Sequence, residues 1–160
     1  MIVVADSTPL IALARIKRLE LLKSIYKTLL IPSAVHHEVV VQGGGRPGAE
    51  EVLNAPWIET RAPRSPAQIH LLLDSLGAGE RETIILAQEL SADLVIMDEV
   101  AGRRELERRA FTGVGTIGVL QQAKLQGIIS AVKPELDALI SHGFHISQRV
   151  YETILSQVGE

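Results

Sequence analysis

The sequence predicts an α/β fold in which helices flank a central sheet of parallel strands. Ile2–Ala5 is a short, entirely apolar run, as expected of a strand that is covered on both faces. Further short apolar runs alternate with segments of helical periodicity, which is typical of a parallel sheet. Two of the runs, Ile2–Ala5 and Leu94–Met97, end directly on an aspartate, Asp6 and Asp98. Because open α/β sheets bind ligands at the carboxyl edge, these aspartates predict a site there.

Length and composition limit the class of protein. We expect the 160 residues, 46% of them apolar, to form one domain, with C-terminal helices at about 133–158 packed on it. The chain has no cysteine, which excludes disulfides, thiolate zinc sites and a cysteine nucleophile. The N-terminal run lacks the length and basic flank of a signal peptide, so we expect a cytoplasmic protein. With a net charge of −3 and five aromatic residues, nucleic-acid binding would need a local basic patch rather than mainly base stacking.

The residues after Asp6 predict two helices and a second strand. Ser7 or Thr8 is expected to cap the first helix, with Pro9 at the first helical position. Leucine-rich helical periodicity and then an apolar run predict helices over Leu10–Ile16 and Leu19–Ile25 and a strand over Thr28–Ile31, which Pro32 stops.

A third helix is expected from Ser33 to about Val41, although the valines at its end are β-prone. Within it Val35, Glu38 and Val39 share one face by i, i+3, i+4 spacing. Glu38 therefore lies on the apolar stripe of this helix. A glutamate there could pair with a cationic side chain, but burying a carboxylate without purpose is costly.

The glycine-rich stretch Gln42–Gly48 formally matches G-x-G-x-x-G, but it follows a helix, so the dinucleotide-binding interpretation fails. We interpret it as a loop on the rim of a site, with Arg46 as its most useful side chain. The following residues predict a short helix over Gly48–Ala55, an edge strand over Trp57–Thr60, a linker over Ala62–Pro66 and a helix from about Ser65 to Leu76.

The next helix is expected to begin at Glu80, after Gly77 and Gly79 interrupt the preceding one. Acidic residues in a first helical turn are favoured by the helix dipole, which alone would explain Glu80 and Glu82. These two glutamates point apart, so at most one of them faces a given site. Apolar residues at i+4 and i+7 make Glu80 the inward one and leave Glu82 peripheral.

Val100–Ala110 is expected to be a helix that carries several arginines. A solvated face paired with Glu105 and Glu107 would explain them. Arg104 and Arg108 nevertheless align at i, i+4 without an acid between them on that face, which suggests a modest basic ridge.

A second G-x-G-x-x-G match, Gly113–Gly118, follows a short strand and opens a helix. A dinucleotide-binding fold usually carries this turn on its first strand, which here ends in Asp6. We therefore interpret it as a strand-to-helix turn with Thr116 as N-cap. The C-terminal third predicts helices over Thr116–Gly127, Lys133–His142 and Ser147–Val158, and shows no further chemistry.

The motifs taken together resemble the PIN domain family. They are Asp6-Ser-Thr-Pro-Leu-Ile, Pro32 with Glu38-Val39, Gly79-Glu80-Arg-Glu-Thr-Ile-Ile-Leu-Ala, Ala92-Asp-Leu-Val-Ile-Met-Asp98 and Gly115-Thr-Ile-Gly-Val-Leu120. The resemblance runs from Met1 to about Leu155 and is greatest to a subgroup related to the VapC-type toxins of toxin–antitoxin pairs. It implies a three-layer fold with a central parallel sheet flanked by helices.

The resemblance also implies Mg²⁺- or Mn²⁺-dependent cleavage of RNA. The acidic positions of the family, which bind metal and catalyse, correspond to Asp6, Glu38, Glu80 and Asp98, with Glu99 as an outer-shell member. The third position, often aspartate in the wider family, is Glu80 here, which leaves the number and spacing of metals open. Such hard cations bind oxygen ligands, in agreement with the absence of cysteine.

Three functions compete. We favour an endoribonuclease, the toxin of a toxin–antitoxin pair, with RNA as substrate, Arg46, Arg104 and Arg108 as RNA contacts, a neutralising antitoxin as partner and a homodimer as assembly. The alternative is a catalytically inactive PIN-fold module that binds RNA or protein. The third candidate, a phosphotransfer protein of receiver or phosphohydrolase type, would need a strand-end lysine beside the acids or a second aspartate where Thr8 stands.

Overall fold

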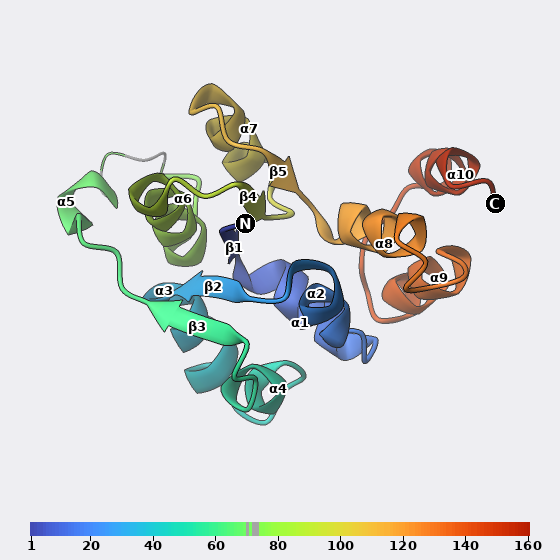
Figure 1. Ribbon diagram of the computed structural model, residues 1–160, viewed down its shortest axis with the longest axis horizontal. Helices are drawn as coiled ribbons and strands as arrows, with labels where there is room; N and C mark the ends of the chain where they lie inside the picture. The colour runs from blue at the N-terminus through green and yellow to red at the C-terminus, as the bar shows by residue number, and fades with distance from the viewer. Residues whose placement is uncertain (70, 72–73) are drawn as a thin grey trace.

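A computed structural model describes residues 1–69, 71 and 74–160 and shows an α/β fold (Figure 1). Its sheet has five strands, all parallel, in the order β3-β2-β1-β4-β5. The strands are β1 (Val3–Ala5), β2 (Leu29–Pro32), β3 (Ile58–Arg61), β4 (Leu94–Ile96) and β5 (Gly113–Val114). The predicted central parallel sheet flanked by helices is confirmed, and β3 is the expected edge strand.

The central strand β1 is covered on both faces. Val3 and Ala5 belong to one buried apolar cluster, whereas Val4 belongs to a second, because alternate residues of a strand point to opposite faces. Ala5 pairs with Ile96 of β4, so the two strands end side by side. This register places Asp6 and Asp98 at the same carboxyl edge of the sheet.

The helices agree with most predicted segments. They are α1 (Ser7–Arg15), α2 (Glu20–Tyr26), α3 (Ser33–His36), α4 (Ala49–Leu53), α5 (Pro66–Ile69), α6 (Ala78–Leu90), α7 (Val100–Arg108), α8 (Thr116–Leu125), α9 (Lys133–Ser141) and α10 (Gln148–Gln157), with a π-helical stretch, η1 (His37–Val41), continuing α3. One cluster unites α1, α2 and α8 with one face of the sheet, and the other unites α6 and α7 with the opposite face. The outcome is the three-layer arrangement visible in Figure 1.

Four predicted boundaries are wrong. The helix expected to begin at Glu80 begins at Ala78 and includes Gly79, with Gly77 as its N-cap. The helix expected over 65–76 is only α5 within the described residues; Leu71 and 74–76 are not helical, and 70, 72 and 73 lie outside the described part. The first helix begins at Ser7, so Asp6 takes the N-cap position without capping through its side chain. In α8 the N-cap is Gly115, and Thr116 is the first helical residue. In the last two cases a site carboxylate, rather than the local cap, determines where the polar side chains point.

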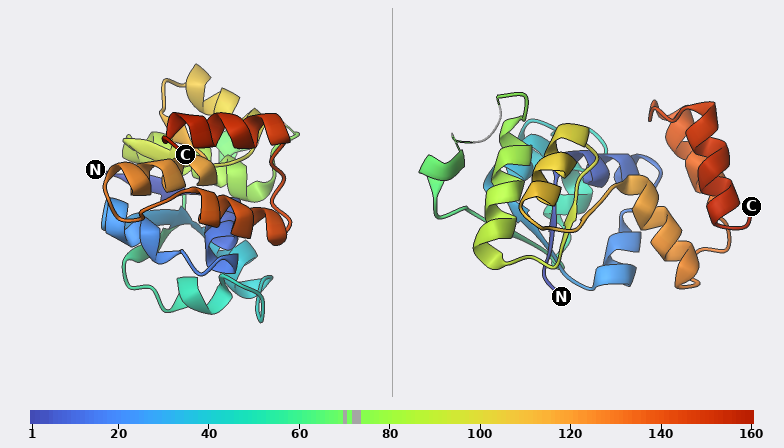
Figure 2. Two further views of the ribbon diagram at one scale, coloured as in Figure 1. Left: turned by 90° about the vertical axis from the view of Figure 1, so that its right-hand side faces the viewer. Right: turned by 90° about the horizontal axis from the view of Figure 1, so that it is seen from above.

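The C-terminal helices lie together at one end of the molecule (Figure 2). Leu136 and Leu139 of α9 and Ile154 and Leu155 of α10 are buried in the same cluster as α1. Glu160 accepts hydrogen bonds from Val132 N and Lys124 Nζ, among others, which ties the end of the chain to α8 and the start of α9. This packing carries the connection between α9 and α10 to the carboxyl edge of the sheet. Within the described residues, no helix is long and apolar enough to span a membrane.

Candidate active site

Asp6 is the most buried of the predicted acidic residues. It follows β1 at the carboxyl edge of the sheet, and only 1% of its surface is exposed. Neither carboxylate oxygen has a hydrogen-bond partner among the described residues. Burial, and after it the negative charges of Glu80, Glu38 and Asp98, raise the pKa of Asp6 from 3.8 to about 7, and the neighbouring Ser7 N–H only partly opposes the rise.

Glu38 and Glu80 reach this aspartate from two different helices. Glu38 lies in η1, and its Oε2 accepts a hydrogen bond of 2.5 Å from Ser7 Oγ, the residue after Asp6. Glu80 lies in the first turn of α6, and among the carboxylates its charge has the largest effect on the pKa of Asp6. The expectation that Glu38 and Glu80 face inward agrees with these interactions.

Asp98 follows β4 and is anchored to the start of α8. Its Oδ1 accepts a hydrogen bond of 2.7 Å from Thr116 N, and its Oδ2 accepts one of 2.6 Å from Thr116 Oγ1. The fold therefore holds Asp98 in one orientation.

Glycines make room for these carboxylates. A Cβ atom at Gly79 would lie 2.7 Å from Glu38 Oε1, and one at Gly115 would lie 2.7 Å from Asp98 Oδ1. Gly115 belongs to the second G-x-G-x-x-G match, so that turn packs against a carboxylate. Any larger residue at these two positions would displace an acidic side chain.

Among the described residues, the four carboxylates have no cationic partner. Within the described part of the chain, no lysine, arginine or histidine forms an ion pair with Asp6, Glu38, Glu80 or Asp98. Buried, unpartnered oxygens and an all-oxygen donor set suit a hard divalent cation. In the conformation seen, no group of three acidic or histidine side chains among the described residues converges closely enough to hold one ion, because Glu38 is turned to Ser7 and Asp98 to Thr116. Mg²⁺ commonly needs only one or two carboxylates beside its waters, so the residues fit such an ion.

Comparison with known proteins identifies the family. A family model described as PIN domain matches residues 2–160. The chain belongs to the PIN domain family. The searches of curated proteins and of solved structures gave no match. Members of this family are generally nucleases, and they typically use divalent metal ions.

Two further acidic residues of this PIN domain have structural contacts. Glu82 Oε1 accepts a hydrogen bond of 3.0 Å from Ala34 N and so holds the first turn of α3 against α6. Glu99 is the N-cap of α7, and its Oε1 accepts a long hydrogen bond of 3.5 Å from Ala101 N. Glu99 also lines a pocket with Asp98, as an outer-shell residue would.

The predicted basic ridge needs a correction. Arg108 pairs with Glu105, which also binds Arg109, so the expectation of no acid beside Arg108 is wrong. The error arose because an i, i+3 contact brings Glu105 beside Arg108 on this helix. Arg104 is exposed and has no ion pair among the described residues. Arg46 lines a small pocket together with Glu38, as expected of a residue on the rim.

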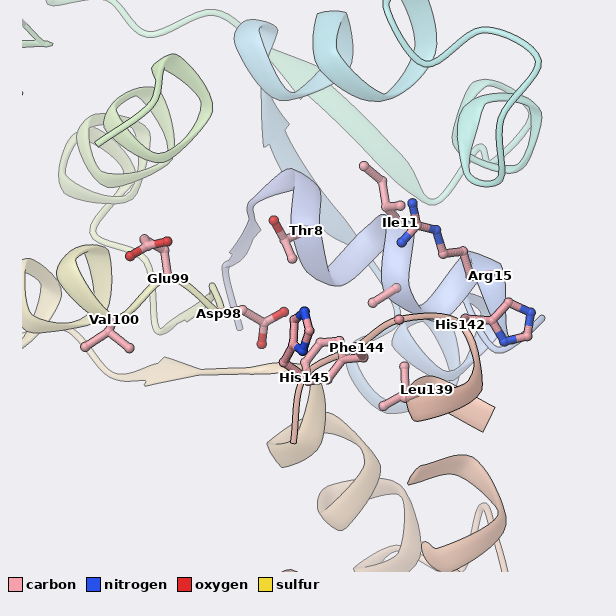
Figure 3. A pocket seen from close by; sticks show the side chains of 12 residues that line it. Thr8, Ile11, Arg15, Asp98, Glu99, Val100, Leu139, His142, Phe144 and His145 are labelled. Atoms are coloured by element: carbon pink, nitrogen blue, oxygen red, sulfur yellow. The ribbon is translucent and has the colours of Figure 1, made fainter. Parts of the chain in front are cut away.

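The structure adds residues that the sequence analysis missed. Arg15 of α1 lines a pocket with Asp98 and a second one with Glu38. His142, Phe144 and His145, from the connection between α9 and α10, line the pocket with Asp98 (Figure 3). The signal for these residues is Gly143, since a glycine directly after a helix predicts where the chain turns. No local sequence pattern could have shown that they lie beside Asp98, which comes more than 40 residues earlier in the chain.

Proposed function

We propose that this PIN domain is a metal-dependent endoribonuclease that cleaves RNA phosphodiester bonds with Mg²⁺ or Mn²⁺. The observation that supports this proposal most is the environment of the Asp6 carboxylate. It is buried, has no hydrogen-bond partner among the described residues and lies close to three further acids. Asp6, Glu38, Glu80 and Asp98 are the proposed catalytic and metal-binding residues. Such a cluster is destabilising without a cation, so function is the simplest reason for its presence.

The residues around the cluster orient its members. Ser7 Oγ holds Glu38, and the N-terminus of α8 holds Asp98 through Thr116. Arg46 and Arg104 are the proposed contacts to the RNA backbone, with Arg108 weakened by its ion pair to Glu105. A bound metal would supply activation of the attacking water and stabilisation of the leaving oxygen.

The test is cleavage of a single-stranded RNA by purified protein with Mn²⁺ and then with EDTA. We expect cleavage that EDTA abolishes and that Asp6→Asn lowers about a hundredfold or more. Glu107→Gln, a change at an exposed glutamate of α7, is the matched control and should leave the rate unchanged. RNA binding without any Mn²⁺-dependent cleavage would instead support the inactive binding module.

The proposed biological role is that of a toxin with a protein antitoxin. It rests on the resemblance to the VapC-related subgroup and on the carboxylate cluster, which has no cationic partner in the described part of the chain and so suits a basic side chain of a partner. Induced expression in a bacterial host should arrest growth, whereas Asp6→Asn should not. Co-expression of the cognate antitoxin should relieve the arrest, and light scattering after size exclusion would test the proposed homodimer.

A further inference from the structure

A pocket of about 610 Å³ opens directly beside the acidic cluster. Three segments form it: one face of α1 from Thr8 to Arg15, the chain from the end of β4 to the start of α7, and the end of α9 with the connection to α10 (Figure 3). Asp98 stands in its wall, so whatever occupies the pocket lies next to the proposed catalytic centre. The volume falls within the range of small-ligand sites.

The walls of the pocket differ in chemistry. Asp98 and Glu99 lie on one side, whereas Arg15 and His142 lie on the other, as Figure 3 shows. Arg15 is exposed and forms no ion pair within the described residues, so its guanidinium is available to an anion. Phe144 lies between the two sides and is half-buried against the main apolar cluster.

The end of α9 fixes Phe144 in place. Gly143 has φ +91, Phe144 N donates a hydrogen bond of 3.0 Å to Leu139 O, and Gly143 N donates one of 3.0 Å to Ile140 O. These two bonds and the left-handed glycine form a Schellman motif, which stops the helix at a defined residue. The aromatic ring is thereby held at the pocket before any ligand arrives.

We propose that this pocket binds one nucleotide of a single-stranded RNA beside the scissile phosphate, with the base against Phe144 and a phosphate on Arg15. The inference rests on the proposed ribonuclease function and names a subsite of it. A single aromatic face suffices for one base, so the low aromatic content of the chain is no obstacle. An unpaired base is required, because the edges and faces of paired bases are not free to enter a pocket.

Arg15 also sets the path of the strand. It lines the smaller pocket of about 190 Å³ that contains Glu38 and Arg46, as well as the pocket of Asp98. The α1 residues shared by the two pockets, Ile11 and Arg15, form a ridge between them. An RNA strand that crosses this ridge would bring its phosphates past Arg46 and Arg15, which both line the smaller pocket beside Glu38.

The test is binding of a fluorescein-labelled single-stranded octaribonucleotide, measured by fluorescence anisotropy in EDTA so that cleavage cannot interfere. We expect Phe144→Leu, which keeps an apolar side chain but removes the ring, to weaken binding about tenfold, and Phe144→Tyr to preserve it. Arg15→Gln should make the slope of log affinity against log salt shallower by about 0.7. Lys27→Gln, the same charge change ahead of β2 at the opposite edge of the sheet, is the control and should leave the slope unchanged.

Two results would overturn the subsite. One is equal affinity of wild type, Phe144→Leu and Arg15→Gln for the octaribonucleotide; the other is equal affinity of the wild type for a duplex of the same length. The failure of the ribonuclease proposal is separate, since it is the absence of Mn²⁺-dependent cleavage by the wild type. If wild type cleaves RNA but both pocket variants bind RNA as tightly as wild type, the subsite alone is rejected. If the variants bind more weakly but wild type does not cleave, the RNA-binding pocket is retained and the nuclease proposal is rejected.

Discussion

Asp6 shows how a single residue links the stability of this protein to its proposed chemistry. Its carboxyl group is buried and has no hydrogen-bond partner among the residues that the structure describes, and three other carboxylates lie close enough to raise its pKa. Asp98 is the contrasting case, because two hydrogen bonds from Thr116 stabilise it. Two acids of the same type therefore have opposite effects on folding, according to the groups that surround them.

The stability of the metal-free protein should depend on pH through Asp6. Its pKa is about 7 in the folded state against 3.8 in the reference state, so the native protein binds the extra proton. The stabilisation that this proton gives the folded state is fully present below pH 3.8 and is lost as the pH rises through about 7. The difference corresponds to roughly 4 kcal/mol, and Asp6→Asn removes it.

Thermal melts in EDTA between pH 4 and 8 measure this effect. The melting temperature of wild type should fall, relative to that of Asp6→Asn, by on the order of 10 °C across that range. Asp98→Asn should melt below wild type because it disturbs the contact with Thr116. Parallel pH profiles for wild type and Asp6→Asn would show that the proton is not on Asp6.

The two neighbouring glutamates of α6 should differ in their effect on cleavage. Glu80→Gln removes a member of the acidic cluster and should lower the rate about a hundredfold. Glu82→Gln keeps an oxygen that can accept the hydrogen bond from Ala34 N, so the rate should stay within about threefold of wild type. Cleavage rates in Mn²⁺ decide between them, and equal losses would mean that both glutamates serve the site.

At the scale of the elements, helix starts and glycines determine where the carboxylates lie. The start of α8 anchors Asp98, η1 presents Glu38, and the first turn of α6 presents Glu80 next to Gly79. The tight approach of Gly79 to Glu38 shows that the Glu38 carboxylate lies directly against the first turn of α6. A change in this packing should alter the site before it alters the fold.

Gly79→Ala tests the close approach of η1 and α6. The new Cβ would stand 2.7 Å from Glu38 Oε1, so Glu38 must move away from Ser7. Mn²⁺ affinity, measured by calorimetry, should fall about tenfold. The melting temperature should change little, because alanine favours a helix over glycine by about 1 kcal/mol and offsets the steric cost. Unchanged Mn²⁺ affinity would show that the position of Glu38 does not matter for the metal.

At the scale of the whole molecule, the distribution of charge governs how an anionic polymer could bind. The net charge is −3, so locally placed arginines must outweigh the general repulsion. Their availability differs, since Arg108 is paired with Glu105 whereas Arg104 has no such partner among the described residues.

Replacing Arg104 and Arg108 separately should reveal this difference. Arg104→Ala is expected to weaken RNA binding and to make the salt slope shallower by about 0.7, which is the loss of one phosphate contact. Arg108→Ala should have a smaller effect, because its charge is partly neutralised. Anisotropy titrations at several salt concentrations measure both effects. Equal effects of the two changes would contradict the expected difference between Arg104 and Arg108.

Local patterns were sufficient to predict the sheet and the acidic residues. A buried strand such as Val3–Ala5 is recognisable from its unbroken apolar run, and a carboxylate at its end must lie at the carboxyl edge of a parallel sheet. The inward face of Glu38 and Glu80 followed from helical spacing in the same way. Boundaries such as the start of α8 were less predictable, because Thr116 binds Asp98 instead of capping its own helix.

Sequence alone determined the class of fold, the family and the residues that end the strands, since these depend on periodicity and on contiguous motifs. Only the tertiary structure decided that Phe144 and Arg15 share a pocket with Asp98. The reason is physical: burial of α9 and α10 against α1 brings their connection to the sheet edge, and this packing depends on contacts between segments distant in the chain. Such contacts depend on the fit of whole surfaces, which no local pattern of residues encodes.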